Sequence, residues 1–273
     1  MVADTPSLSS PNEYDDFADI YQVWTDTAAS AQANLEFYLD LYREAVGPVV
    51  ELGVGDGRIA VPAACRGQDV IGVDLSPAML ERCRARAMAA GVLDRLAFVC
   101  EDFRRFQLDV PAGLIALPYH SLGHVLSLED KRSALAHVFS QLEPGGRFVF
   151  DDFYVTPALV DQMRKVQLRA TYRSSGDIDT LLWVTSLVDE ASQAMTVVTW
   201  EDFLDTDGVL MRRRYRRLHL SWLDPSQARS LLTEAGFVID ACYGGFDRTP
   251  FSEATAREQI WIARRPGADV TAA

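Results

Sequence analysis

The sequence lacks the features of membrane and secreted proteins. No apolar run approaches the length that crosses a bilayer, so we expect no membrane association. The N-terminus has neither the basic region nor the apolar stretch of a secretory signal, and the chain's four cysteines form no C-x-x-C pair. These absences predict a cytoplasmic protein with reduced thiols.

Basic residues are also scarce, with 26 Lys and Arg against 39 Asp and Glu, which gives a formal net charge of -13. Such a charge repels phosphate backbones and anionic lipids. The one dense basic run, from Arg212 to Arg217, is interrupted by Tyr215 and lies in strand-like sequence. Nucleic acid is therefore not an expected partner.

Hydrophobic residues make up 48% of the 273 residues, enough for a full core. From Pro48 onward, short unbroken apolar segments alternate with helical ones. The apolar segments are PVVELGVG, DVIGVD, LAFVCED, AGLIALPY and RFVFDDF. Helical patterns follow as RIAVPAACRG, as SPAMLERCRARAMAAG with Ser76 as N-cap, and over residues 128–142. This alternation predicts an α/β domain with a doubly wound, mostly parallel sheet, its core spanning residues 48–153.

Residues 154–223 have a different pattern. Four long segments rich in β-branched and aromatic residues alternate in polarity and are separated by the hairpin signals SGD, EASQ and DTDG. They predict an antiparallel sheet inserted into the α/β domain. Residues 224–265 then restore the domain with a helix capped by Asp224 and two final strands, before a flexible tail at 266–273.

The N-terminal region divides into a polar, flexible stretch at 1–12 and a helical segment at 13–47. Aromatic residues recur there at intervals of three and four: Tyr14, Phe17, Tyr21 and Trp24. This spacing places four rings on one helix face. The face either attaches the helix to the core or covers a ligand as a lid.

The stretch VVELGVGDGR ends the first apolar strand in a glycine-rich turn. Its glycines are Gly53, Gly55 and Gly57, and Glu51 precedes them on the strand. A dinucleotide fingerprint, G-x-G-x-x-G, would require a third glycine where Arg58 stands, which disfavours a dehydrogenase. Asp74 ends the next strand about 20 residues after the first glycine, where a carboxylate can accept hydrogen bonds from two ribose hydroxyls.

The third strand ends in CEDF, where Asp102 can accept a hydrogen bond from an adenine amino group and Phe103 can cover the ring. Together, ELGVGDGR, VIGVDLSPAML, EDF and LEPGGRFVFDDF resemble the class I S-adenosylmethionine-dependent methyltransferases over residues 14–265. The resemblance implies a Rossmann-like sheet of seven strands and S-adenosyl-L-methionine as cofactor. It implies cofactor contacts from Tyr21, Glu51, Gly53, Gly55, Gly57, Asp74, Leu75, Met79, Asp102, Phe103 and Leu117.

Within that family, the aromatic N-terminal segment and the inserted sheet are similar to the small-molecule branch that includes glycine N-methyltransferase and aminosugar N,N-dimethyltransferases. FADIYQVWT is similar to their lid segment, which makes Tyr21 the candidate lid tyrosine. The N/D-P-P-Y/F motif of nucleic-acid amino methyltransferases is replaced here by LPYHSLGHV. The resemblance thus implies a small-molecule acceptor, bound by the insert, and is compatible with a homodimer.

An amine acceptor must lose a proton before it attacks the methyl group, and a histidine can take that proton near neutral pH. His120 and His124 follow the fourth strand, four residues apart, so in a helix they would share a face. We assign His124 the role of base or acceptor-orienting residue, with His120 and Tyr119 beside it. A histidine that caps a loop is the alternative for His124. The pair also has metal half-site spacing, but no third ligand is evident and we predict no metal.

Three functions remain open. Methyl transfer to an amine nitrogen of a small metabolite is the leading hypothesis. The second is C-methylation of an electron-rich aromatic ring, with Tyr119 in the pocket and His120 as base. The third is a nucleotide-binding module that has lost catalysis, which the intact GVGDG turn, Asp74 and Asp102 disfavour.

Overall fold

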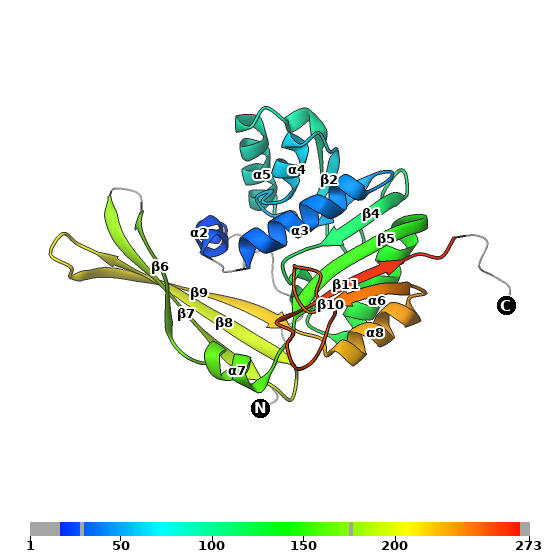
Figure 1. Cartoon of the computed structure of the whole chain (residues 1–273). Coiled ribbons are helices and arrows are strands. Elements are labelled where there is room, and N and C mark those ends of the chain that lie inside the picture. Colours follow the sequence, from blue (N-terminus) through cyan, green and yellow to red (C-terminus); the bar gives the residue numbers. More distant parts are fainter. Residues whose placement is uncertain (1–16, 28–29, 175–176, 268–273) are drawn as a thin grey trace. The chain divides into compact units, whose positions relative to one another are not determined.

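The structure is a computed structural model that describes residues 17–27, 30–174 and 177–267. It divides the chain into two units. The smaller unit consists of the segment up to Ala31 together with Val155–Ser221, and the larger consists of Gln32–Tyr154 and the segment from Trp222 onward. Figure 1 shows the elements of each unit.

The larger unit is built on a seven-stranded sheet. Its strands are β1 (Val49–Leu52), β2 (Val70–Asp74), β3 (Leu96–Cys100), β4 (Ala112–Leu117), β5 (Leu142–Phe153), β10 (Val238–Tyr243) and β11 (Glu258–Arg264). They lie in the order β10-β11-β5-β4-β1-β2-β3. β11 runs antiparallel to both of its neighbours, β10 and β5, and the pairs from β5 to β3 are parallel. The predicted mostly parallel, doubly wound sheet is confirmed.

Five helices belong to this sheet: α3 (Ala31–Glu44), α4 (Ala60–Cys65), α5 (Pro77–Ala89), α6 (Leu128–Gln141) and α8 (Pro225–Glu234). Two short 3₁₀ helices, η1 (Leu93–Arg95) and η2 (Ser121–His124), lie in the connections. Ser76 caps α5 by accepting a hydrogen bond from the Met79 N–H, and Asp224 begins α8 in a capping box with Gln227. Both predicted N-caps are therefore present.

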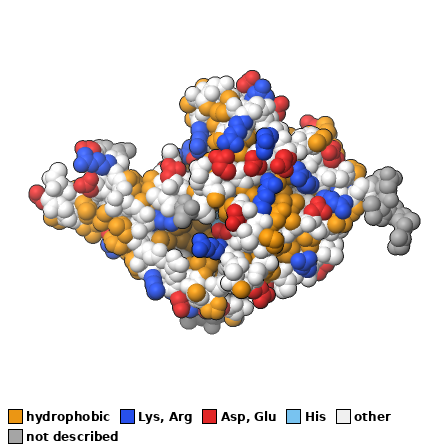
Figure 2. Space-filling model, in the orientation of Figure 1, with side chains coloured by type: hydrophobic (Ala, Val, Ile, Leu, Met, Phe, Trp, Pro, Cys, Tyr) orange, Lys and Arg blue, Asp and Glu red, His pale blue; other side chains and the backbone are white. Residues whose placement is uncertain are grey.

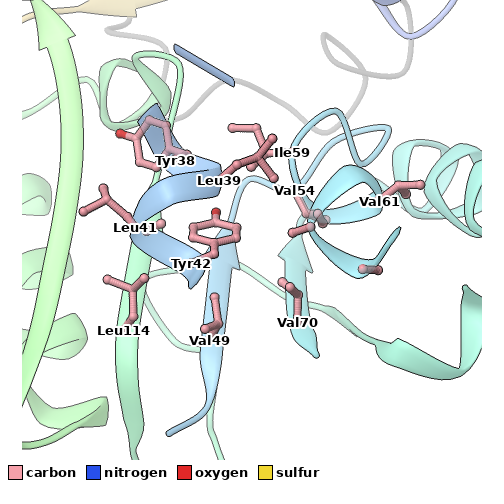
Figure 3. Packing of buried hydrophobic residues seen from close by; sticks show 14 of the residues in the cluster. Tyr38, Leu39, Leu41, Tyr42, Val49, Val54, Ile59, Val61, Val70 and Leu114 are labelled. Carbon is pink, nitrogen blue, oxygen red and sulfur yellow. The ribbon is translucent and has the colours of Figure 1, made fainter. Parts of the chain in front are cut away.

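Each face of the sheet has its own hydrophobic cluster. Val49 and Leu114 point to the face covered by α3, α4 and α5, whereas their neighbours Val50 and Ile115 point to the face covered by α6 and α8. On the first face, Tyr38, Leu41 and Tyr42 of α3 pack over the strands (Figure 3). Because strands buried on both faces need apolar residues at every position, the sequence shows unbroken runs there rather than alternation.

The strand order reverses between β1 and β4, since the chain leaves β1 toward β2 on one side and returns from β3 to β4 on the other. In open α/β sheets, ligands bind in the crevice outside the carboxyl ends of the strands at such a reversal. The connections that follow β1 and β4 are therefore where a site is expected.

The smaller unit contains the predicted antiparallel sheet, in the order β6-β7-β8-β9. Its elements are α2 (Tyr21–Asp26), α7 (Pro157–Met163), β6 (Gln167–Ser174), β7 (Ile178–Asp189), β8 (Ala194–Leu204) and β9 (Leu210–Ser221). β9 is an edge strand, but Arg216 on it is buried in an ion pair with Glu201. The charged residues of β9 therefore include a buried ion pair as well as exposed side chains.

The segment 13–47, predicted as one helical lid, is divided between the two units. Phe17 and Ile20 are buried against Leu182 of the antiparallel sheet, and Tyr21 and Trp24 pack beside them. In contrast, α3 is buried on the larger sheet. The two parts separate because each apolar face meets a different sheet. Tyr14 lies outside the described residues, and a lid role for Tyr21 stays a prediction.

Acidic and basic side chains are interspersed with hydrophobic ones on the face of the molecule shown in Figure 2. The excess of acidic residues therefore does not form a single continuous field on that face. Among the helices that the structure describes, none is long and apolar enough to span a membrane.

Candidate functional site

The turn after β1 requires its glycines. Gly53, Gly55 and Gly57 have φ values of 63°, 57° and 79°, in the left-handed region that side-chain-bearing residues rarely adopt. A Cβ atom at Gly57 would lie 2.5 Å from the Sγ atom of Cys83. The turn thus presents backbone without side chains where β1 meets α4.

Asp74, at the end of β2, lies against this turn. Its Oδ2 atom accepts the Gly55 N–H at 2.8 Å, and its Oδ1 atom accepts the Ser76 N–H at 2.8 Å. Asp74 is half-buried and is held in place by backbone on both sides, as a residue that binds two hydroxyls must be. Nearby Leu75 is 42% exposed, whereas Met79 is fully buried.

Asp102 follows β3 and forms an unpredicted pair with Arg104. Its carboxylate accepts the backbone N–H and the side-chain Nε–H of Arg104, each at 2.9 Å. Burial acts to raise the pKa of Asp102, but the hydrogen bonds and charge of Arg104 lower it below its ordinary value. Any amino group bound by Asp102 must share the carboxylate with Arg104. Phe103 packs at the edge of the core on the α6 and α8 face of the sheet.

Glu51 lies beneath the glycine turn rather than in it. It is 3% exposed and accepts a hydrogen bond from the Tyr42 hydroxyl at 3.0 Å. Burial raises the pKa of Glu51 to about 8, against the opposing effects of Tyr42 and Arg58. At neutral pH the carboxyl group is thus mostly protonated. Leu117, at the end of β4, is also fully buried.

The connection after β4 has an unusual backbone. Tyr119 and His120 both adopt left-handed conformations, with φ values of 61° and 59°, and such conformations cost about 1–2 kcal/mol each. Asp151 of β5 stabilises them, since its Oδ1 and Oδ2 atoms accept the N–H groups of Tyr119 and His120, each at 3.0 Å. Asp151 is fully buried and also accepts the Tyr38 hydroxyl at 2.6 Å.

This connection lies directly against the glycine turn. The Oγ atom of Ser121 would be 3.1 Å from a Cβ atom at Gly53. The guanidinium of Arg58 lies over the Tyr119 ring, 4.8 Å from its centroid, and donates a hydrogen bond to Asn34. In the sequence, Arg58 served only as evidence against a dinucleotide-binding turn. In the structure it joins the turn, α3 and the segment after β4.

His120 is held from two sides. Its Nε2 atom lies 2.8 Å from Glu258 Oε2, and its ring stacks on Phe153 with the centroids 3.9 Å apart. Burial alone would lower the pKa of His120, but Glu258, Asp151 and Asp152 together raise it to about 9. His120 therefore carries a proton at neutral pH. Neither Glu258 nor Phe153 was identified from the sequence, where they are remote from His120.

The α-helix in which His120 and His124 would share a face does not form. Residues Ser121–His124 form a 3₁₀ turn, and the left-handed His120 lies outside it. The N–H groups held by Asp151 prevent an α-helix from starting there.

His124 has an environment opposite to that of His120. Burial, together with the charges of Lys131 and His120, lowers the pKa of His124 to about 3. Lys131 is itself 1% exposed and donates a hydrogen bond to the Leu122 carbonyl at 2.6 Å. Burial lowers the pKa of Lys131 to about 8. Among the described residues, no group of three or more possible ligands could hold a metal ion.

Comparison with known proteins identifies this arrangement. Residues 49–146, from β1 into β5, match the family described as methyltransferase domain. The matched part of the chain, which contains the glycine turn and Asp74, is thus similar to a methyltransferase domain. The tRNA 5-carboxymethoxyuridine methyltransferase of Escherichia coli is 33% identical over 143 residues, which are 49% of this chain and 53% of that protein. The chain thus spans about half the length of that relative.

Two solved structures share the fold over nearly the whole chain. The CcbJ methyltransferase of Streptomyces caelestis has a TM-score of 0.77 at 22% identity, covering 95% of this chain and all of that one (100%). CalS10 of Micromonospora echinaspora, an amino pentose methyltransferase solved with bound S-adenosylmethionine, has a TM-score of 0.63 at 19% identity. That match covers 94% of this chain and 92% of that one.

S-adenosylmethionine is the ligand bound in the solved structure of CalS10. The residues present fit it. The turn carries no side chain at Gly53, Gly55 or Gly57, and the Asp74 carboxylate lies against it. When bound, the cofactor supplies an electrophilic methyl group on a sulfonium.

Proposed function

We propose that this protein transfers a methyl group from S-adenosylmethionine to an amine nitrogen of a small molecule. One observation carries the proposal. The connection after β4, which holds Tyr119 and the acid–base group His120, lies against the glycine turn through Ser121 and Arg58. In our proposal, His120 in its deprotonated form takes the acceptor's proton near the turn expected to hold the methyl donor.

The preference for a small amine has two supports. The likeness to the amino pentose methyltransferase extends over 94% of the chain and so includes the inserted sheet. The likeness to the tRNA-modifying relative covers 49% of the chain. A net charge of -13 also disfavours a polyanionic substrate.

For methyl transfer, the protein mainly has to align the acceptor nitrogen with the methyl group and to remove a proton from the amine. As the bond from the acceptor nitrogen to the methyl carbon forms, the carbon–sulfur bond breaks and its electron pair stays on sulfur. Holding the two reactants in line can supply about 7–11 kcal/mol of barrier lowering. An amine that enters as an ammonium ion must first give a proton to a base within hydrogen-bond reach.

We assign that role to His120 rather than to His124, which the sequence favoured. The buried His124 is neutral at all ordinary pH values, and its pKa of about 3 makes it a weak proton acceptor. His120 has a pKa of about 9, close to that of an amine, so a proton can pass between them with little cost in free energy. Tyr119 would line the acceptor side.

A second function, C-methylation of an electron-rich aromatic ring, is favoured by the stack of Tyr119, His120 and Phe153. Such a stack suits a flat acceptor, and His120 would take the ring proton that is lost.

The two functions are separated by incubating the purified chain with S-adenosylmethionine and two acceptor panels, aminosugars and polyhydroxylated aromatic compounds. Release of S-adenosylhomocysteine and the mass of one added methyl group are measured. Transfer to the aminosugars alone supports the proposal, and transfer to the aromatic panel alone would replace it by the second function. Failure with both panels, in a chain that binds S-adenosylhomocysteine, would overturn both.

A further inference from the structure

Glu258 is the first residue of β11, the one antiparallel strand of the larger sheet. The register pairs Glu258 with Phe153 and the next residue, Gln259, with Asp152. The Gln259 side chain also donates to the Phe153 carbonyl at 2.9 Å and to the Leu223 carbonyl at 2.6 Å. The backbone that carries Glu258 is therefore fixed beside the ring on which His120 stacks.

We propose that Glu258 is a positioning residue that orients the His120 ring and holds its Nε2 proton, so that the two side chains act as one acid–base dyad in methyl transfer. This inference rests on the function proposed above. It assigns a role to a residue more than 100 positions away from the histidine in the sequence.

The geometry leaves the imidazole few alternatives. Nε2 lies 2.8 Å from Glu258 Oε2 and 3.6 Å from Asp151 Oδ2, so the carboxylates hold a proton on this nitrogen. The Phe153 ring, inclined by 22° to the imidazole, restricts its rotation. When a histidine nitrogen is bound to a carboxylate in this way, the other nitrogen, Nδ1, exchanges the second proton. Only Nδ1 is then left to serve the acceptor.

Charged groups from several elements surround His120. Asp151 and Asp152 of β5 are fully buried, and they act on His120 together with Glu258 of β11. In addition, His124 of η2 interacts electrostatically with His120, and Lys131 of α6 interacts with His124 and Asp152. Arg58 lies over the adjacent Tyr119 ring. The side chains of His120 and Glu258 are each 15% exposed, whereas Asp151, Asp152 and Lys131 are buried.

In the proposed step, one proton moves from the acceptor to His120 before the methyl group is transferred. The acceptor ammonium gives a proton to Nδ1 of neutral His120, which becomes an imidazolium stabilised by Glu258. The freed lone pair on nitrogen forms the bond to the methyl carbon, and the imidazolium later returns its proton to water. The rate should therefore rise with pH as His120 loses its proton, through about pH 9.

The first test needs no acceptor. The chain has four histidines, so NMR titration of labelled imidazoles can follow each of them, with His120→Gln to assign the signal. Glu258→Gln keeps the shape but removes the charge, and it should lower the pKa of His120 by about one to two pH units. Glu258→Asp should restore part of that shift. Glu143→Gln, at the other end of the sheet, is the matched control and should leave the pKa unchanged. An unshifted His120 in Glu258→Gln would overturn the dyad.

The second test uses methyl transfer to whichever amine the wild-type chain accepts. Glu258→Gln should move the acid limb of the kcat profile to lower pH and should lower the plateau kcat about tenfold or more, while S-adenosylhomocysteine affinity stays at the wild-type level. A limb that stays in place would refute the catalytic role even if the NMR shift is found. Absence of transfer by the wild type would instead refute the proposed function, and the titration would still decide whether the dyad exists.

Discussion

The carboxylate of Asp151 holds both the backbone and the ring of His120. Its Oδ2 atom accepts the His120 N–H at 3.0 Å and lies 3.6 Å from Nε2 of the same residue. A buried carboxylate on β5 thus fixes a left-handed conformation in the connection after β4. The same carboxylate adds to the effect of Glu258 in raising the pKa of the His120 ring.

Asp151→Asn should destabilise the fold. The Asp151 carboxylate accepts hydrogen bonds from the N–H groups of Tyr119 and His120 and from the Tyr38 hydroxyl. The substitution removes its charge and replaces one accepting oxygen by an NH₂ group, which cannot accept from these donors. We expect a loss of about 3 kcal/mol in the free energy of unfolding, measured in urea. Asp109→Asn, at an exposed position, is the control and should change it by less than about 0.5 kcal/mol. Equal effects of the two substitutions would mean that Asp151 does not hold the connection.

Asp74→Asn should weaken cofactor binding. The carboxylate faces the glycine turn, and a charged acceptor is worth about 1.5–3 kcal/mol in a hydrogen bond. Calorimetry should therefore show S-adenosylhomocysteine affinity falling about 10- to 100-fold, and no binding of NAD to the wild type. Asp69→Asn, just before the other end of β2, pairs only with Arg95 on the surface and should keep wild-type affinity. Unchanged affinity in Asp74→Asn would contradict the ribose assignment.

Gly57→Ala should disturb the turn for two reasons that a pair of variants can separate. Gly67 also has a positive φ, 92°, but nothing lies within 4 Å of a Cβ atom there. Gly67→Ala should then lower the free energy of unfolding only through the cost of a left-handed backbone at alanine, about 1–2 kcal/mol. Gly57→Ala adds the contact with Cys83 and should lose about 1–3 kcal/mol more. Adding Cys83→Ala to Gly57→Ala should recover part of that difference. No recovery would mean that Cys83 is not the obstacle.

Stability should depend on pH through His120. Its folded pKa of about 9 lies above the ordinary 6.5, so the folded chain binds the proton more tightly than the unfolded chain does. The resulting stabilisation, at most about 3 kcal/mol, is fully present below pH about 6.5 and is lost as the pH rises through about 9. The difference in unfolding free energy between wild type and His120→Gln should shrink over that window. A constant difference for His120→Gln across this pH range would contradict the raised pKa.

Much of the fold could be predicted because it depends on local patterns. The apolar runs of β1, β2 and β4 are unbroken since helices cover both faces of the sheet, and Ser76 and Asp224 cap their helices through contacts three residues away. The glycine turn and Asp74 follow strands whose ends must meet at one edge. The division of segment 13–47 could not be predicted, because an amphipathic face does not specify which sheet it will contact.

The sequence by itself determined which residue types stand at the ends of the strands, and with them the similarity of residues 49–146 to a methyltransferase domain. Only the tertiary structure decided how the histidines differ. Glu258 and Asp151 approach His120 from strands far away in the chain, while Lys131 and burial act on His124, so two neighbouring imidazoles have pKa values of about 9 and about 3. Electrostatic interaction depends on distance in space and on desolvation, and the order of residues along the chain encodes neither directly.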